Sequence, residues 1–222
     1  MPRLIILMAL SLAACGGSLK YTIDDNTIAS TSSEERAAIN TARDEQNRVQ
    51  DELRSAEQQL KTAENDLDLA ENEYKTAKLA KDSAKLGREA AAQSGDLNRK
   101  NKAEREYTAA DKQKDAADAK IDWLSRRRKW AKANVEMAEA QVDAVKAKIE
   151  LEKAKLCQQK NIRPSEKFNV LEYEQQQNEK QQKYNDARRE LDSKRGDVDD
   201  KERRYQSAQQ AADAAKQAAA QP

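Results

Sequence analysis

Apolar residues recur at a spacing of seven in three runs along the chain, and in the first run a small residue, nearly always alanine, follows three positions after each. The pattern starts just after Ser32, where Glu35 three residues later predicts a capping box at a helix start. A sustained heptad of this kind is typical of helices that pack as a coiled coil. In the first run, the large positions include Ile39, Leu53, Leu60, Leu67 and Tyr74.

Two breaks divide the pattern into three runs. The first contains Ser94, Gly95 and Asp96, residue types that favour turns, and the heptad phase slips across it. The second is the segment QQKNIRPSEKF at residues 158–168, where Pro164 removes a helical hydrogen-bond donor. Because the phase continues across this second break, a continuous helix kinked at the proline is an alternative to a turn.

The runs predict helices at about residues 34–93, 97–158 and 165–220. If neighbouring helices fold back on each other about the two breaks, Leu53 faces Ala138 and Ala131 faces Leu191, so that large residues meet alanine. The sequence therefore predicts an all-α fold, a long antiparallel three-helix coiled-coil bundle. Helices of roughly 60 residues would each be about 90 Å long, making the body a rod. The alternative is an extended, Pro-kinked helical hairpin.

The first fourteen residues have the features of a secretory signal peptide. Arg3 supplies a positive charge, and residues 4–12 form an apolar run that is too short to span a bilayer, which takes about 20 residues. The run ends in LAAC, with the cysteine at position 15. This motif resembles the lipobox of bacterial lipoproteins, in which the signal peptide is cut before a lipidated cysteine.

The resemblance implies that Cys15 becomes the acylated first residue of the mature chain and anchors it in a membrane, facing the periplasm. Gly16 follows, where an Asp favours inner-membrane retention in enterobacteria, so we expect the outer membrane. Residues 15–33 are rich in Gly, Ser, Thr, Asp and Asn, and we expect them to form a flexible tether. The alternation in LKYTI, residues 19–23, also permits a short strand, but it has no obvious partner.

The composition limits the kinds of chemistry that the chain can perform. The chain has 222 residues, 36% of them charged, and a net charge of +1, so its overall charge does not favour nucleic acid. It has no histidine, which excludes His-based catalysis and His metal sites, and no glycine-rich phosphate loop. Once Cys15 is lipidated, Cys157 is the one remaining thiol. We therefore expect no enzyme, cofactor, metal site or small-molecule substrate.

One stripe on the second predicted helix is unusual. Trp123, Trp130 and Met137 are spaced by seven and Leu151 follows after fourteen, all one position before the alanine-rich seam. This phase predicts exposed side chains that bind a partner, either a second copy of the chain or another envelope protein. The alternative is that bundle rotation or the tether covers them. The basic run SRRRK at residues 125–129 is expected to face the acidic residues 64–73, and the alternative is contact with anionic lipid or phosphate.

A second resemblance concerns the helices only. Residues 150–168 resemble the hairpin tip of periplasmic adaptor proteins of bacterial efflux and secretion systems, and residues 63–78 are similar in texture to outer-membrane efflux channels. Two functions are therefore predicted. The chain is a structural or scaffolding lipoprotein of the cell envelope, or an accessory subunit of an envelope export or efflux assembly that binds other coiled coils.

Overall fold

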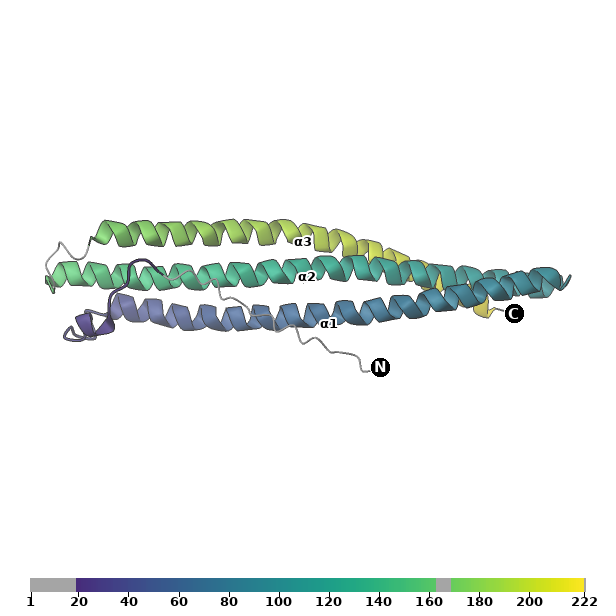
Figure 1. Cartoon of the computed structure of the whole chain (residues 1–222), viewed down its shortest axis with the longest axis horizontal. Coiled ribbons are helices and arrows are strands. Elements are labelled where there is room, and N and C mark those ends of the chain that lie inside the picture. The colour runs from purple at the N-terminus through teal and green to yellow at the C-terminus, as the bar shows by residue number, and fades with distance from the viewer. Residues whose placement is uncertain (1–18, 163–168, 222) are drawn as a thin grey trace, which may run out of the picture. The chain divides into compact units, whose positions relative to one another are not determined.

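The structure, a computed structural model, describes residues 19–162 and 169–221, and in these ranges it is built from helices without a strand. A short 3-10 helix, η1 (Asp25–Ile28), precedes three long α helices (Figure 1). These are α1 (Ala37–Gln93), α2 (Leu97–Lys160) and α3 (Val170–Ala220). The prediction of an all-α, three-helix fold is confirmed.

Local side-chain chemistry explains where the first two helices start. The main-chain amide of Ser32 donates to the Glu35 carboxylate across 2.8 Å, and the Glu35 amide donates to the Ser32 hydroxyl across 3.2 Å. This reciprocal pair is the predicted capping box, and it caps the turn at residues 33–36 that leads into α1 at Ala37. At the α1–α2 turn, Gly95 has a φ of 73°, a conformation that glycine adopts without a steric penalty. Asp96 then caps α2 by accepting from the amide of Asn98 across 2.9 Å.

The continuous Pro-kinked helix is wrong, because α2 ends at Lys160. Asn161 takes a left-handed conformation with a φ of 49°, and the amide of Ile162 donates back to the Cys157 carbonyl across 3.1 Å. A left-handed residue together with such a backward hydrogen bond is a common way for an α helix to end. Pro164 and the predicted start at residue 165 lie outside the described residues. The third helix begins at Val170 instead, behind the capping side chain of Asn169.

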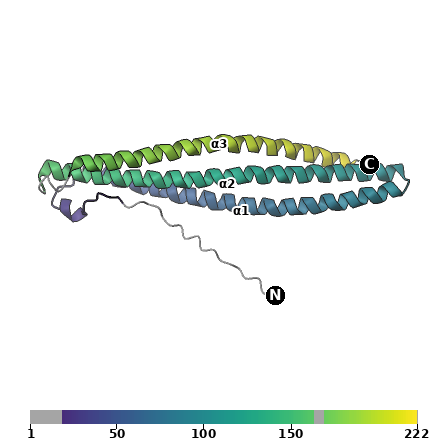
Figure 2. The ribbon, with the colours of Figure 1, turned by 45° about the horizontal axis from the view of Figure 1, so that its top comes forward.

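The chain divides into two compact units. Unit 1 comprises Met1–Val49 and Glu139–Tyr184, as far as these are described, and unit 2 comprises Gln50–Ala138 and Asn185–Pro222. In unit 1, α2 is joined to α1 by an ion pair between Lys148 and Glu45 (2.7 Å). It is joined to α3 by a pair between Lys180 and Asp143 (2.6 Å), and Figure 2 shows α2 running beside both helices there.

Unit 2 is built on the predicted seam. Ala56, Val135 and Ala138 form one buried cluster with Leu53 packed against it, and Leu67, Ala70 and Leu124 form another. Two ion pairs flank the second cluster, Asp66 with Arg127 and Glu73 with Lys120. The pairs are seven residues apart on each helix but in opposite order, as expected for two helices that fold back on each other.

The second helix has a further buried face that the sequence reading did not assign to the core. Besides the predicted seam, several small residues in other heptad positions of α2 are at most 4% exposed. This helix contacts both α1 and α3, so one seam cannot serve both partners. The additional buried residues are Ala116, Ala133, Ala144, Ala147 and Ala154.

Candidate functional site

The segment next to the predicted lipid anchor is docked on unit 1. Cys15 itself lies outside the described residues, but the chain from residue 19 onward can be followed. Ile23 and Ile28 are 4% and 1% exposed, and both belong to the core cluster of unit 1 (Figure 1 shows η1 beside the start of α1). The expectation of a flexible tether is therefore wrong for residues 19–28.

A buried ion pair on α2 holds the main chain of this segment. Lys153 and Glu150 are 6% and 8% exposed, and their charged groups lie 2.8 Å apart. The amide of Ile23 donates to the Glu150 carboxylate across 2.6 Å. The ammonium of Lys153 donates to the Ile23 carbonyl across 3.0 Å. One main-chain residue thus satisfies both members of a buried pair, which would be costly to bury without such partners.

Two residues upstream, a glutamine of α3 binds the main chain in the same way. The Tyr21 amide donates to the Gln176 side-chain oxygen across 2.9 Å, and the Gln176 side-chain nitrogen donates to the Tyr21 carbonyl across 3.0 Å. The ring of Tyr21 lies 5.7 Å from that of Tyr173, centroid to centroid. Because Tyr21 and Ile23 present both main-chain groups to side chains, the segment is fixed by residues of two helices. We call Glu150, Lys153 and Gln176 the clasp.

Charge strengthens the clasp at its outer edge. Lys153 also contacts the Asp25 carboxylate across 2.7 Å, and Arg43 of α1 reaches the same carboxylate across 2.8 Å. The hydrogen bond from Lys153, followed by the charges of both cations, lowers the pKa of Asp25 below its usual 3.8. Within the cluster, burial raises the pKa of the Tyr173 hydroxyl above its usual 10.0, and the negative charge of Glu150 acts in the same direction.

The clasp was missed by the sequence reading. In sequence, Glu150 and Lys153 resemble any i, i+3 pair on a solvated helix face. The available signal was the alternation of LKYTI together with Ile28, which marks side chains that need a partner surface. The alternative prediction of a short strand at residues 19–23 rested on this alternation, but the sequence offered no second strand for it to pair with. In the structure, side-chain amide and carboxylate groups of helices take the place of that strand.

The tryptophan stripe in unit 2 is not an exposed surface. Trp123, Trp130 and Met137 are half-buried. The Trp123 indole stacks on the Tyr205 ring of α3, with 5.3 Å between centroids and 6° between planes. Its Nε1 is buried without a hydrogen-bond partner. The expectation of fully exposed side chains is therefore wrong: Trp123 packs on α3, and Trp130 lies beside α3 residues such as Arg195.

Leu151, the fourth stripe residue, lies in unit 1 and is 8% exposed. It belongs to the same buried cluster as Ile23 and Tyr173. The prediction that Leu151 binds a partner is contradicted by this burial. The alternative reading, in which the segment after Cys15 covers part of the stripe, describes Leu151 correctly.

Two arginines of the basic run of α2 pair with neighbouring helices. Arg127 pairs with Asp66 of α1 across 2.8 Å, and Arg126 lies 3.7 Å from Asp197 of α3. The expected pairing with residues 64–73 is therefore confirmed for Arg127.

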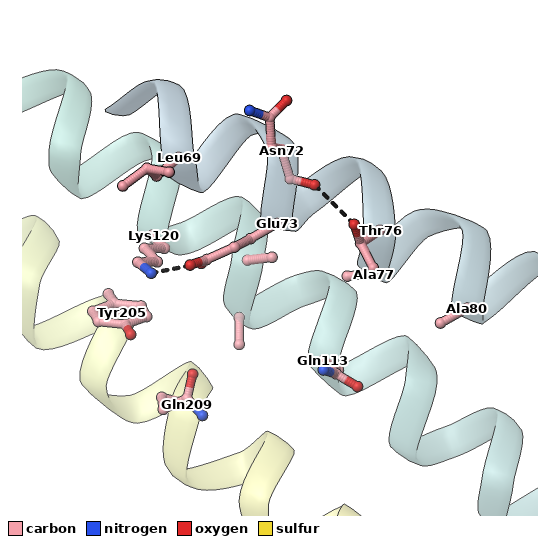
Figure 3. A pocket seen from close by; sticks show the side chains of 12 residues that line it. Leu69, Asn72, Glu73, Thr76, Ala77, Ala80, Gln113, Lys120, Tyr205 and Gln209 are labelled. Atoms are coloured by element: carbon pink, nitrogen blue, oxygen red, sulfur yellow. Dashed lines mark hydrogen bonds and ion pairs between the residues drawn. The ribbon is translucent and has the colours of Figure 1, made fainter. Parts of the chain in front are cut away.

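A groove of about 550 Å³ lies among the three helices of unit 2 (Figure 3). Its size follows from the small side chains that line it, among them Ala77 and Ala80 of α1. Tyr205 of α3 stands at one side, and Figure 3 shows Lys120 pointing to Glu73 beside it, at 2.5 Å. This ion pair joins the two charged residues that line the groove, and the rest of its lining is apolar or uncharged, with hydroxyl groups at Thr76 and Tyr205.

Comparisons with protein-family models, curated proteins and solved structures found no match for this chain. No helix in residues 19–162 or 169–221 is long and apolar enough to cross a membrane. In the same ranges, no group of three His, Cys, Asp or Glu side chains is placed to hold a metal ion.

Proposed function

We propose that this protein is a lipoprotein of the bacterial cell envelope, anchored through an acylated Cys15, and that it serves as a structural helical scaffold. The clasp carries the proposal. The predicted anchor precedes Tyr21 by only six residues, and a chain of that length spans at most about 20 Å. Because Tyr21 and Ile23 are bound to α2 and α3, a lipid on Cys15 would hold unit 1 close to the membrane surface.

The use of the buried polar groups supports a structural role over an enzymatic one. Glu150, Lys153 and Gln176 are the buried polar side chains of the described residues, and each is occupied by the main chain of the N-terminal segment. An accessory role in an export or efflux assembly has weaker support, because the stripe that favoured it is half-buried at Trp123, Trp130 and Met137 and buried at Leu151.

Fatty-acid labelling tests the anchor. Cells that produce the wild-type chain in the presence of labelled palmitate should yield a labelled, membrane-bound protein. The Cys15→Ser variant should stay an unlabelled precursor, whereas Cys157→Ala, which removes the buried thiol, should be labelled like the wild type. Label retained in Cys15→Ser would refute the anchor.

The scaffold role needs a separate measurement in cells. A strain without the protein should show a weakened envelope, measured as sensitivity to detergent or low osmolarity, and only the lipidated chain should restore it. A deletion strain with an intact envelope would contradict the scaffold role even if Cys15 is acylated.

A further inference from the structure

Three leucines around the α1–α2 turn of unit 2 are left outside its core. Leu79 and Leu86 on α1 are 70% and 67% exposed, and Leu97 at the start of α2 is 69% exposed. Leu79 and Leu86 are seven residues apart, so they lie on one face of the helix. The buried face of α1 in this region is formed by other residues, such as Ala77 and Ala91. The fold does not use these leucines.

The leucines lie in a basic stretch of the chain, residues 78–102. Residues 78–102 contain seven Lys or Arg and three Asp or Glu, a net charge of +4, whereas the whole chain carries +1. The rest of the protein is therefore net negative by three charges. A local excess of positive charge of this size favours an anionic partner.

Several of these cations are not engaged elsewhere. Lys81 pairs with Asp111, and Arg88 lies 3.4 Å from Glu104. Lys78, Lys85 and Arg99 are exposed and form no ion pair within residues 19–162 and 169–221. Lys78 and Lys85 each directly precede an exposed leucine. Basic and apolar side chains thus alternate on the outside of the turn.

We propose that this turn, residues 78–102, is a docking surface for a membrane that contains anionic lipids. The leucines would enter the boundary between headgroups and acyl chains while the lysine and arginine side chains reach the phosphates. A coiled-coil partner fits less well, because the apolar seam stops after two residues. Asn72 and Gln93 occupy the next positions, seven before Leu79 and seven after Leu86. An interface with lipid does not require a longer apolar stripe than these leucines provide.

The test uses the full chain in a Cys15→Ser background, so it does not depend on the acyl anchor. The variant Ser83→Cys places a thiol between Leu79 and Leu86 for labelling with a polarity-sensitive fluorophore; Cys157 is only 1% exposed. Labelled protein is mixed with vesicles of phosphatidylcholine alone or of phosphatidylcholine with phosphatidylglycerol. We expect a blue shift with the anionic vesicles only, and its loss in high salt. A label at the exposed Ser193 of α3 should not shift.

Matched variants separate this surface from general adsorption. The double variant Leu79→Ser, Leu86→Ser should abolish the shift. Leu69→Ser should not, because Leu69 is 62% exposed but lies in the acidic stretch of α1. Replacing Lys78 and Lys85 by methionine should weaken vesicle binding about 25-fold, at roughly fivefold per charge.

Three outcomes would overturn the proposal. They are an equal shift with neutral vesicles, an equal shift at Ser193, and a shift that survives the double leucine variant. Melting curves of each variant, followed by circular dichroism, establish that the helices are retained. A leucine variant that fails to fold is replaced by the lysine variant, whose substitutions leave the apolar residues untouched.

Discussion

Lys153 of α2 donates a hydrogen bond to the main-chain carbonyl of Ile23 across 3.0 Å, although 130 residues separate them in sequence. The same ammonium lies 2.8 Å from Glu150. Both members of this buried pair therefore depend on the N-terminal segment for full hydrogen bonding. The segment in turn has no strand or helix of its own to satisfy its main chain around residue 23.

Replacing Lys153 by methionine should destabilise the protein by about 3 kcal/mol, because it leaves the Glu150 carboxylate buried without its cation. The control is Lys148→Met, which removes an ion pair with Glu45 that is substantially exposed, and it should cost less than about 1 kcal/mol. Chemical denaturation measures both, and hydrogen exchange should show residues 19–28 opening only in Lys153→Met. Equal costs for the two variants would contradict a buried clasp.

Gln176→Glu tests the second part of the clasp with almost no change in shape. The carboxylate can still accept from the Tyr21 amide, but it cannot donate to the Tyr21 carbonyl. The Glu carboxylate would then face the Tyr21 carbonyl, two acceptors without a proton between them. This should lower the free energy of unfolding by about 1–3 kcal/mol and speed amide exchange at residues 21–23. Gln175→Glu adds the same charge at an exposed neighbouring position and should have little effect. Unchanged exchange in Gln176→Glu would show that these hydrogen bonds do not hold the segment.

The heptad predicted much of the helical core correctly, because the burial of Val49, Ala56 and Ala131 is dictated by helix periodicity alone. It could not assign the second face of α2. A helix with two neighbours needs two seams, and the stripe of Trp123 and Leu151 reads in sequence either as that second seam or as a free surface. Only the position of α3 distinguishes them.

The clasp was beyond prediction for a different reason. The side chains of Glu150 and Lys153 become buried only because residues far away in sequence cover them. Nothing in the local pattern separates this pair from the more exposed pair Glu152 and Lys155, which has the same spacing and order on the same helix. Charged residues are rarely buried, so the sequence favours the interpretation that Glu150 and Lys153 lie on a solvated helix face.

Acid should weaken the outer edge of the clasp. The folded-state pKa of Asp25 is lowered, so its contribution to stability is present above its usual 3.8 and is lost as pH falls through the folded value. Its carboxylate is 64% exposed, which limits the contribution to less than about 1 kcal/mol. Asp25→Asn should therefore lower the melting temperature by about 2 °C at pH 6, and this difference should shrink as the pH falls below 3.8. Asp44→Asn, at an exposed position of α1, serves as the control. A difference that persists unchanged into acid would exclude a charge effect.

Disulfide crosslinking tests the direction of the helices. Ala56 and Val135 share a buried cluster, so cysteines at these positions in a Cys157→Ala background should form an intrachain bridge on oxidation. The pair at Ala131 and Leu191 tests α2 against α3. As a control, Ala56 paired with Ala103 should not crosslink, because a fold-back about Gly95 places them far apart. A bridge that forms only between two chains, seen as a dimer on a non-reducing gel, would contradict the fold-back.

Trp123 distinguishes packing from partner binding. If the stripe were free, Trp123→Ala would leave stability unchanged and weaken an association. The indole stacks on Tyr205 and packs against the cluster around Leu67 and Leu124. We therefore expect Trp123→Ala to lower the free energy of unfolding by about 2–3 kcal/mol.

Two further variants separate the stacking from the size of the ring. Trp123→Phe keeps an aromatic face for Tyr205 and removes the buried, unpartnered Nε1 group, so it should cost less than about 1 kcal/mol. Trp130→Ala should also be mild, since Trp130 lines an open groove beside Arg195 and stacks on no ring in the described part of the chain. The measurement is thermal unfolding of all three variants at a concentration where the protein is monomeric. A Trp123→Ala variant as stable as the wild type would show that the ring contact adds nothing to the fold, and the stripe would again be a candidate surface for a partner.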